Sequence, residues 1–314
     1  MSTRRIRPLN RASRRALAHK IRHYSDFDIE RDYRMLAEIG CLAKQKGEHY
    51  LNGNKVVDQF TFEERLNTRG HSGISFYELW KQQDEYKTKP YVRNFLKFTQ
   101  KTVPGISKEK MWYTLARFYF GAIQIFKPLL AMEYYCKYNP KCVLDPTMGW
   151  GGRLVGAYAI GVPKYIGIDQ NERLRQPYKQ LTKFLDSQTR IIRPNDETTE
   201  TELIFADALK IDYSKYTYDM VFTSPPYYSI EKYSGQVERS KDEWDRDFYT
   251  PLFQKTWEHL QPGGHYVINI PIEVYNRVAK PVLGPATTKY PLKKKQRRPK
   301  EGDKYSEFIY VWKK

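Results

Sequence analysis

The sequence contains few cysteines, and their spacing does not suit metal or redox chemistry. Among 314 residues there are three, Cys41, Cys136 and Cys142, and no C-x-x-C pair. None of the six histidines stands near them at the spacing of zinc ligands. We therefore expect no metal site and no disulfide, and we interpret each cysteine as a small buried apolar residue in a reducing compartment.

Long apolar runs are also absent. No stretch approaches the roughly 18 to 20 apolar residues that span a bilayer, and no hydrophobic signal-peptide core follows Met1. We therefore expect no membrane partner. The expected location is intracellular and soluble, in the cytoplasm, nucleoid or nucleus.

Acidic residues are scarce relative to basic ones. The chain has 54 Lys and Arg against 36 Asp and Glu, a net charge of +18. This excess predicts attraction to a polyanion, either nucleic acid or an anionic membrane surface, and does not choose between them. The length suffices for a full core, as one medium domain with an appendage or as two small domains.

The first half of the chain divides into two regions by composition. Residues 1–22 contain many arginines and no acidic residue. We interpret them as a basic arm that binds nucleic acid, with an organelle import signal and a solvated, disordered tail as the alternatives. Residues 23–105 alternate polar helical segments with Gly-rich turns and predict a mainly helical region.

The remaining residues, 106–314, alternate short apolar segments with amphipathic ones. Residues 107–137 are expected to be helical, with one break at Lys127-Pro128. Six strands and three helices are then predicted: strands 142–146, 165–169, 203–207, 218–224, 265–270 and 307–312, and helices 152–161, 171–188 and 245–260. This alternation indicates an α/β fold with a doubly wound, mostly parallel sheet. A cationic loop, 272–305, is expected before the last strand, as a phosphate contact or as a solvated loop without a partner.

Ligands of doubly wound folds bind at the carboxyl ends of the strands, where this sequence carries polar and glycine-rich signals. In "LDPTMGWGGRLVG", residues 144–156, Gly149 and Gly151 allow a tight turn close to a ligand. A dinucleotide site would need glycine where Leu154 stands, and the preceding Asp145 suits an amine-bearing ligand better than a pyrophosphate. A nicotinamide cofactor is therefore disfavoured.

Two further strands end in a carboxylate. Asp169 ends "YIGID", where it can accept both hydroxyls of a ribose or cap the next helix. Asp207 ends "LIFAD", where it can bond an adenine amino group or form a turn. A sulfonium-bearing adenosine fits this set, with the glycine turn under its methionine part and Asp145 near its ammonium group.

The fourth signal is "TSPPYY", residues 223–228, directly after the apolar run "YDMVF". Two consecutive prolines remove two backbone donors and stiffen the chain, so the sheet cannot continue. The strand therefore ends in a rigid hook of four residues, Ser224, Pro225, Pro226 and Tyr227. The alternative is a proline-rich turn that only caps the strand.

The two motifs "DPTMGWG" and "TSPPYY" together resemble the amino-methyltransferases of DNA, which transfer a methyl group from S-adenosylmethionine to the exocyclic nitrogen of adenine or cytosine. That family carries Asp-Pro-Phe-x-Gly-x-Gly, and a hook of Asp, Asn or Ser followed by Pro-Pro and an aromatic residue. The resemblance covers about residues 120–270. It implies contacts to the cofactor from Asp145, Pro146, Thr147, Gly149 and Gly151, a capping segment at Phe126, Lys127 and Pro128, and contacts to the target base from Ser224, Pro225, Pro226 and Tyr227.

The sequence departs from the family pattern at Thr147, where phenylalanine is usual, so that Met148 or Trp150 must supply an apolar wall. The roughly seventy residues between the motifs leave no room for a separate target-recognition domain. Recognition is therefore expected from residues 23–105, from the 272–305 loop, or from both.

The hook has a chemical reason in this interpretation. An exocyclic amino nitrogen is a poor nucleophile because its lone pair is delocalised into the ring. The Ser224 oxygen and the Pro225 carbonyl can accept its two hydrogens and turn the lone pair outward, while Tyr227 stacks on the base. A base in double-stranded DNA must be flipped out to arrive there, so Tyr228 and Tyr233 are candidate base contacts or ordinary core aromatics.

Several alternatives stay open. A serine-led hook favours cytosine N4 over adenine N6 only slightly. An RNA base methyltransferase and a catalytically inactive nucleic-acid-binding protein of the same fold are the other candidates. Methylation at carbon 5 of cytosine is excluded, because no cysteine nucleophile lies near the hook.

Overall fold

The computed structural model describes residues 9–43, 50–70, 72–121, 123–195, 198–228, 239–292 and 307–314. Their contacts divide them into two compact units. Unit 1 takes its described residues from 9–25 and 61–124, and unit 2 from 26–60, 125–228 and 239–314. This division differs from the expected boundary after residue 105, because the chain enters unit 2, returns to unit 1 and then enters unit 2 again.

Unit 2 contains a seven-stranded sheet with the strand order β3-β2-β1-β4-β5-β7-β6. The strands are β1 (Cys142–Asp145), β2 (Lys164–Asp169), β3 (Glu200–Phe205), β4 (Tyr218–Thr223), β5 (Leu260–Pro271), β6 (Thr288–Pro291) and β7 (Glu307–Lys313). The first five are parallel to one another, and β7 runs antiparallel between β5 and β6. The expected α/β fold with a doubly wound, mostly parallel sheet is therefore confirmed.

The register brings the carboxyl ends of the parallel strands to one edge of the sheet. Asp145 in β1 pairs with Gly167 in β2, and Asp169 pairs with Phe205 in β3. Because β7 is antiparallel, its first residue, Glu307, lies opposite Pro271 at this same edge. The edge therefore collects the ends of β1 to β5 and the start of β7.

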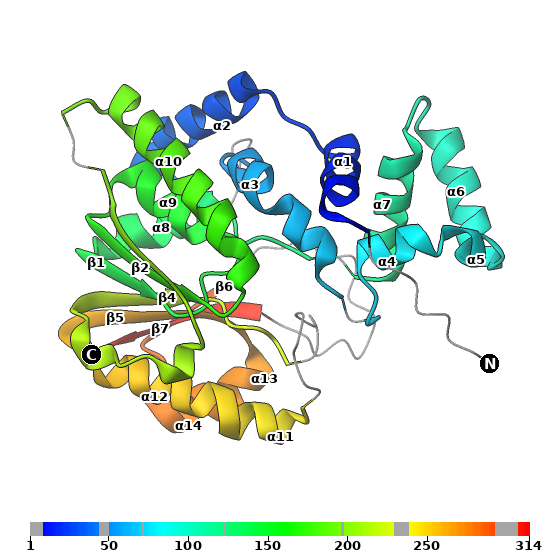
Figure 1. Ribbon diagram of the computed structural model, residues 1–314. Coiled ribbons are helices and arrows are strands. Elements are labelled where there is room, and N and C mark those ends of the chain that lie inside the picture. Colours follow the sequence, from blue (N-terminus) through cyan, green and yellow to red (C-terminus); the bar gives the residue numbers. More distant parts are fainter. Residues whose placement is uncertain are drawn as a thin grey trace. The chain divides into compact units, whose positions relative to one another are not determined.

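Helices cover both faces of the sheet in unit 2 (Figure 1). One face carries α2 (Asp26–Ile39), α8 (Pro128–Tyr138), α9 (Gly152–Ile160) and α10 (Arg175–Ile192). The other carries α11 (Lys241–Trp244), α12 (Thr250–Glu258), α13 (Ile272–Val274) and α14 (Lys280–Leu283), with the π-helical turns η5 (Asp245–Tyr249) and η6 (Tyr275–Ala279). Because helices cover both faces of the sheet, the strands carry apolar residues on both sides. Strand β1, for example, is buried along its whole length.

The structure corrects two further sequence expectations. Residues 272–292 of the expected 272–305 loop form α13, η6, α14 and β6, and 293–305 lie outside the described residues. Edge strand β6 was not predicted, because its four residues, "TKYP", show no apolar pattern. The helix expected over 107–137 is divided into two, since α7 ends at Tyr119 and α8 begins at Pro128, which is a longer break than the one predicted at Lys127-Pro128.

Unit 1 is helical. It contains α1 (Arg11–Ile21), α4 (Phe76–Lys81), α5 (Gln83–Lys87), α6 (Pro90–Thr102) and α7 (Lys108–Tyr119), while α3 (Asn54–Asn67) begins in unit 2 and ends in unit 1. Its core is formed by apolar residues of these helices, among them Trp112, Leu115 and Leu79. Among the described residues, none of the helices has both the length and the apolar character of a membrane span.

The N-terminal region is more ordered than a basic arm. Residues 11–21 form α1, which begins at the cap Asn10 and buries Leu17, Ala18 and Ile21 in the core of unit 1. The spacing 17, 18, 21 places these side chains on one helix face, a signal that the arginine content hid. The alternative of a solvated tail is therefore wrong for 11–21, and residues 1–8 lie outside the described part of the chain.

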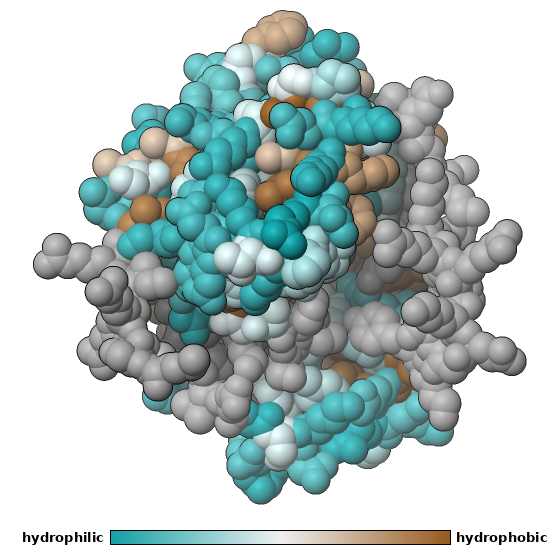
Figure 2. All heavy atoms as spheres, turned by 90° about the vertical axis from the view of Figure 1, so that its right-hand side faces the viewer, coloured by the Kyte–Doolittle hydropathy of each residue, from teal (hydrophilic) through white to brown (hydrophobic). Residues whose placement is uncertain are grey.

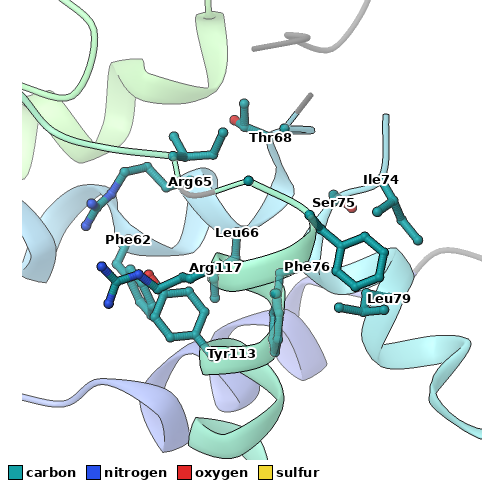
Figure 3. A pocket seen from close by; sticks show the side chains of 15 residues that line it. Phe62, Arg65, Leu66, Thr68, Ile74, Ser75, Phe76, Leu79, Tyr113 and Arg117 are labelled. Carbon is teal, nitrogen blue, oxygen red and sulfur yellow. The ribbon is translucent and has the colours of Figure 1, made fainter. Parts of the chain in front are cut away.

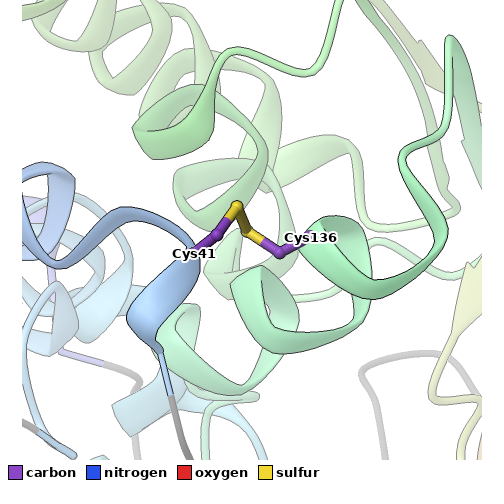
Figure 4. Close-up of a disulfide and its surroundings, with 2 residues drawn as sticks. All are labelled: Cys41 and Cys136. Carbon is purple, nitrogen blue, oxygen red and sulfur yellow. A yellow bond between two sulfur atoms is a disulfide. The ribbon is translucent and has the colours of Figure 1, made fainter.

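The expectation that no disulfide forms is also wrong for one pair. Cys41 in the short turn η1 (Gly40–Leu42) is bonded to Cys136 in α8, with their Cα atoms 5.3 Å apart (Figure 4). The two cysteines are separated by 95 residues, so only the packing of α8 against η1 shows that they meet. Cys142 remains a free, buried thiol, and burial raises its pKa to about 12.

Candidate active site at the carboxyl edge of the sheet

The glycine motif forms the turn from β1 to α9. Gly149 and Gly151 have φ angles of 58° and 88°, in the left-handed region that favours glycine. Gly152 is required for a different reason: a Cβ atom there would lie 1.7 Å from the carbonyl oxygen of Phe126. The predicted tight turn is present, and the third glycine lets the chain before α8 lie directly on the start of α9.

Asp145 is completely buried, and both of its carboxylate oxygens are used within the protein. Arg153 binds it with two hydrogen bonds, Nε to Oδ2 at 2.6 Å and Nη2 to Oδ1 at 3.1 Å. The Tyr165 hydroxyl donates to Oδ2 at 2.5 Å, and the Thr223 hydroxyl donates to Oδ1 at 3.0 Å. Asp145 therefore links the ends of the strands. Arg153 already occupies its carboxylate with two hydrogen bonds, in the place where a cofactor ammonium was predicted to bind.

Sequence reasoning missed Arg153, which is the first charged residue of α9. Burial acts to lower the pKa of this guanidinium, but the Asp145 carboxylate more than offsets the effect, so that the pKa is raised well above its usual value. Arg153 also donates to the Thr147 carbonyl at 2.6 Å and lies 5.0 Å from the centre of the Phe126 ring. Its position eight residues after Asp145, in the first turn of a predicted helix, was the available signal.

Thr147, the departure from the family pattern, links β1 to β4. Its hydroxyl lies 2.5 Å from that of Thr223, and because Thr223 gives its hydrogen to Asp145, Thr147 is the donor. A phenylalanine could not make this bond. Met148 and Trp150, which were expected to supply the apolar wall in place of the phenylalanine, are both buried.

Asp169 is half-buried at the end of β2 and touches the glycine turn. Its Oδ2 accepts from the Gly149 amide at 2.9 Å, and its Oδ1 accepts from the Asn171 amide at 2.8 Å. Burial raises the pKa of Asp169 to about 6, with the two amide donors opposing that shift. Each carboxylate oxygen has a second acceptor position, which keeps the predicted contact with two ribose hydroxyls chemically feasible.

Asp207 caps the short turn η3 (Ala208–Lys210) by accepting from the Leu209 amide at 3.0 Å. This is the turn role weighed against an adenine contact, and it occupies one carboxylate oxygen only. The contact with adenine stays a prediction.

The predicted capping segment reaches the glycine turn through Phe126. Lys127 is the N-terminal cap residue of α8, where Pro128 takes the first helical position, and the Lys127 ammonium lies 3.2 Å from the centre of the Tyr50 ring. The Phe126 ring packs at 5.4 Å against Phe222 of β4. The assignment of Lys127 and Pro128 to a cofactor remains a prediction.

The hook begins where β4 ends, and Ser224 is its first residue. The Ser224 hydroxyl lies 3.0 Å from that of Tyr227, which in turn lies 2.9 Å from the Asn269 carbonyl and 2.9 Å from Glu307 Oε1. The Asn269 carbonyl and the Glu307 carboxylate can only accept, so Tyr227 gives its single hydrogen to one of them. Ser224 gives its hydrogen to Tyr227 or to Asn269 Oδ1, which lies 3.5 Å away, so its oxygen keeps an acceptor position.

The prolines hold two carbonyl groups in different surroundings. Tyr249 of η5 donates to the Pro226 carbonyl and accepts from the Tyr228 amide at 3.1 Å, so one phenol clamps the end of the hook. Among the described residues, none donates to the Pro225 carbonyl. The hook thus contains two acceptors in sequence, the Ser224 oxygen and the Pro225 carbonyl, and their contact with a target base stays a prediction.

The two aromatic residues considered as base contacts differ in outcome. Tyr228 is buried in the core of unit 2, with its hydroxyl 3.0 Å from Asp245 Oδ1 and its ring 5.5 Å from that of Tyr249. It is a core aromatic. Tyr233 lies outside the described residues.

Sequence reasoning also missed Asn269, Glu307 and Tyr249. Asn269 is a polar residue inside the apolar run "VINI" of β5, and it is buried with its amide donating to the Phe308 carbonyl at 3.1 Å. A lone amide in a core strand is a usable signal. Glu307 and Tyr249 carry none, because they approach the hook only through the antiparallel pairing of β7 and the packing of η5.

Unit 1 holds a separate small pocket (Figure 3). The side chains of Arg65 and Arg117 lie beside the rings of Phe62 and Tyr113 along its wall. Its volume of about 30 Å³ holds one or two waters and is far too small for a nucleotide. We assign the candidate active site to the strand ends instead.

No protein-family model and no curated protein matches the sequence. Among solved structures, the chain is similar to an rRNA methylase from Streptococcus thermophilus, with 16% identity and a TM-score of 0.37 over 62% of this chain and 99% of that one. TehB from Haemophilus influenzae (13%, 0.35) is matched over 63% of this chain and 65% of its own, and TrmN from Thermus thermophilus (15%, 0.32) over 60% and 48%. The chain therefore spans less than two thirds of TehB and of TrmN.

Proposed function

We propose that this protein transfers a methyl group from S-adenosylmethionine to the exocyclic amino group of a base in DNA, cytosine N4 or adenine N6. The observation that carries the proposal is the position of the hook beside the glycine turn. Strands β1 and β4 are parallel neighbours, with Leu144 opposite Val221. Thr223 then bonds both Asp145 and Thr147, so the two motifs start from one hydrogen-bonded point.

The residues of the glycine turn suit an adenosine with an amino acid tail. Asp169 offers carboxylate oxygens to a ribose, while Gly149 holds that carboxylate in place through its amide. Gly151 and Gly152 let the turn pack closely on Leu181 and on the Phe126 carbonyl, where a side chain would not fit, and this packing fixes the shape of the turn. When bound, S-adenosylmethionine supplies a methyl group on a positively charged sulfur, which an amino nitrogen takes up directly.

The hook supplies the remaining requirement, an amino group with its lone pair turned outward. Ser224 and Pro225 accept the two amino hydrogens, which reduces delocalisation of the lone pair into the ring. Tyr227 is held by Asn269 and Glu307 and offers its ring as a fixed surface for the base. No nucleophilic side chain is needed, since the transfer is a single displacement.

The test is transfer from radiolabelled S-adenosylmethionine to unmethylated duplex DNA and to total RNA, followed by nucleoside chromatography. Label in N4-methylcytosine or N6-methyladenine from DNA is the expected result and identifies the base. Label found only in RNA nucleosides would contradict the DNA substrate while keeping the reaction. Absence of label in both, with the cofactor bound, would contradict the enzymatic role and favour a binding protein.

A further inference from the structure

Helices α6 and α7 of unit 1 expose an unusual number of aromatic side chains. Tyr91, Phe98, Phe118 and Tyr119 are 38%, 65%, 58% and 43% exposed, and they are the only large apolar residues exposed on the described parts of these two helices. The rings of Tyr91 and Tyr119 lie 4.9 Å apart across the two helices. Exposed aromatic rings gathered on two adjacent helices in this way indicate a binding site.

The helix pair is surrounded by positive charge. Between Glu85 and Glu133, Glu109 is the only acidic residue, and it is paired with Lys20. Eight basic residues of unit 1 lie in the same stretch: Lys87, Lys89, Arg93, Lys97, Lys101, Lys108, Lys110 and Arg117. The partner of this surface must therefore carry negative charge.

Three of the cations form a row on α6. Arg93, Lys97 and Lys101 recur every four residues, so they lie on one side of the helix about 6 Å apart along its axis. All three are exposed, and within the described residues none of them makes an ion pair. The row runs beside exposed Phe98, whose ring contacts no other ring of the described chain. Figure 2 views the side of the molecule that bears α6, where hydrophobic residues are dispersed among hydrophilic ones.

We propose that this α6–α7 face, formed by Tyr91, Arg93, Lys97, Phe98, Lys101, Phe118 and Tyr119, binds an unpaired stretch of nucleic acid. The inference rests on the proposed function for the class of partner, and it adds that the substrate includes single-stranded bases. Exposed rings offer stacking to bases, and the cation row offers contacts to the backbone. A fully paired duplex hides its base faces and would use the cations alone.

The chemistry of the face favours this partner over a membrane or another protein. Its exposed apolar residues are all aromatic, without the leucine and isoleucine of an interfacial membrane helix. A protein partner would more often meet a patch with fewer lysines, because lysine is depleted in protein interfaces. Aromatic rings beside cations that make no ion pair among the described residues are the features that bind single-stranded nucleic acid.

The experiment measures binding of the full chain to a fluorescein-labelled 12-nucleotide single strand and to the corresponding duplex, without cofactor. The double variant Phe98→Ala, Phe118→Ala should bind the single strand at least about 5-fold more weakly and the duplex almost unchanged. The double variant Lys97→Glu, Lys101→Glu should bind both ligands more weakly. For the single strand, the slope of log K against log salt concentration should become about 1.4 less steep.

Matched controls lie on unit 2. Phe27→Ala removes a ring that is 70% exposed between Asp26 and Asp28 on α2, and Lys179→Glu, Lys183→Glu reverses two exposed lysines at the same spacing on α10. Both should leave affinity for the single strand within about twofold. Circular dichroism of each variant verifies that it is folded.

The outcomes separate this inference from the proposed function, because binding is measured without methyl transfer. Unchanged affinity of the Phe98, Phe118 variant for the single strand would overturn the inference, even if the protein methylates DNA. Equal losses for strand and duplex would overturn the stacking role. If this variant instead kept its affinity for the single strand and lost self-association, the face would be assigned to a protein partner. If it lost binding to phosphatidylglycerol vesicles instead, the face would be assigned to a membrane. A selective loss for the strand in a protein that methylates nothing would support this inference and refute only the proposed function.

Discussion

Arg153 and Asp145 form a bidentate ion pair inside unit 2, with Arg153 Nε 2.6 Å from Asp145 Oδ2 and side-chain exposures of 3% and 0%. The pair joins the end of β1 to the start of α9, directly under the glycine turn. Removing the cation alone would leave Asp145 buried and unpaired, which is far more costly than losing an exposed ion pair.

Arg153→Met should therefore lower the free energy of unfolding by about 3 to 5 kcal/mol. Urea unfolding followed by circular dichroism measures the effect. Arg190→Met, at an exposed position on α10, is the control and should change the free energy by less than about 0.5 kcal/mol. Similar losses for both variants would refute the structural weight assigned to the pair.

Ser224→Ala removes one of the two acceptors that the hook offers to an amino group. Since the other contacts of the hook involve Tyr227, Tyr249 and Asn269, the fold should persist. We expect methyl transfer to fall about 100-fold or more, with affinity for S-adenosylhomocysteine unchanged. Single-turnover rates and calorimetric titrations measure the two quantities. Ser187→Ala, on the exposed side of α10, is the control, and an unaltered transfer rate for Ser224→Ala would exclude the hook from the mechanism.

Tyr249 is expected to act as a positioning residue. It is fully buried, and its hydroxyl bonds both the Pro226 carbonyl and the Tyr228 amide. Tyr249→Phe leaves these two groups unpaired and should cost about 1 to 3 kcal/mol of stability, while also lowering kcat about tenfold. Tyr266→Phe is the matched control, because Tyr266 is equally buried and bonds Thr256 away from the hook. It should lose stability without losing kcat, and parallel losses of kcat would reduce Tyr249 to a packing residue.

The sequence predicted the strands that place the site, because their apolar runs and the alternation with helices are local patterns. It also predicted the tight turn at Gly149 and Gly151 and the end of β4 at the double proline. It did not predict the partner of Asp145, since a carboxylate at a strand end looks the same whether it faces a ligand or an arginine. The supports of the hook were beyond reach for a similar reason: Glu307 is 80 residues from Tyr227 and joins it only through antiparallel pairing.

The disulfide between Cys41 and Cys136 closes a loop of 95 residues. The chain-entropy account gives roughly 4.7 kcal/mol for a cross-link of this span, and disulfides typically stabilise the folded state by about 2 to 4 kcal/mol. Reduction with a phosphine, and the variant Cys41→Ser, should both lower the free energy of unfolding by this amount. Cys142→Ala is the control for loss of a buried thiol. It keeps the disulfide, so reduction should lower its free energy of unfolding by the same amount as in the wild type. A wild-type protein insensitive to reduction would contradict a stabilising disulfide.

Asp169 should make cofactor binding depend on pH near 6. Burial raises its pKa from 3.8 to about 6, so the ionised form that accepts ribose hydroxyls is lost as the pH falls through 6. With only the ionised form competent, the Kd for S-adenosylhomocysteine should rise about tenfold between pH 7.5 and 5.0. Asp169→Asn should bind more weakly at pH 7.5 and show no such dependence.

The same shift has the opposite sign for the stability of the unliganded protein. Because the folded pKa of Asp169 lies above its unfolded value of 3.8, the folded chain binds more protons between pH 3.8 and about 6. The contribution of this carboxyl to the free energy of unfolding therefore decreases as the pH rises through that window, and stays low above it. Relative to Asp169→Asn, the unliganded wild type should lose stability from pH 4 to pH 7, while saturating S-adenosylhomocysteine should reverse the difference at pH 7. Thermal unfolding of both proteins with and without the ligand measures this, and parallel pH profiles would show that Asp169 keeps an ordinary pKa and has no special role at the turn.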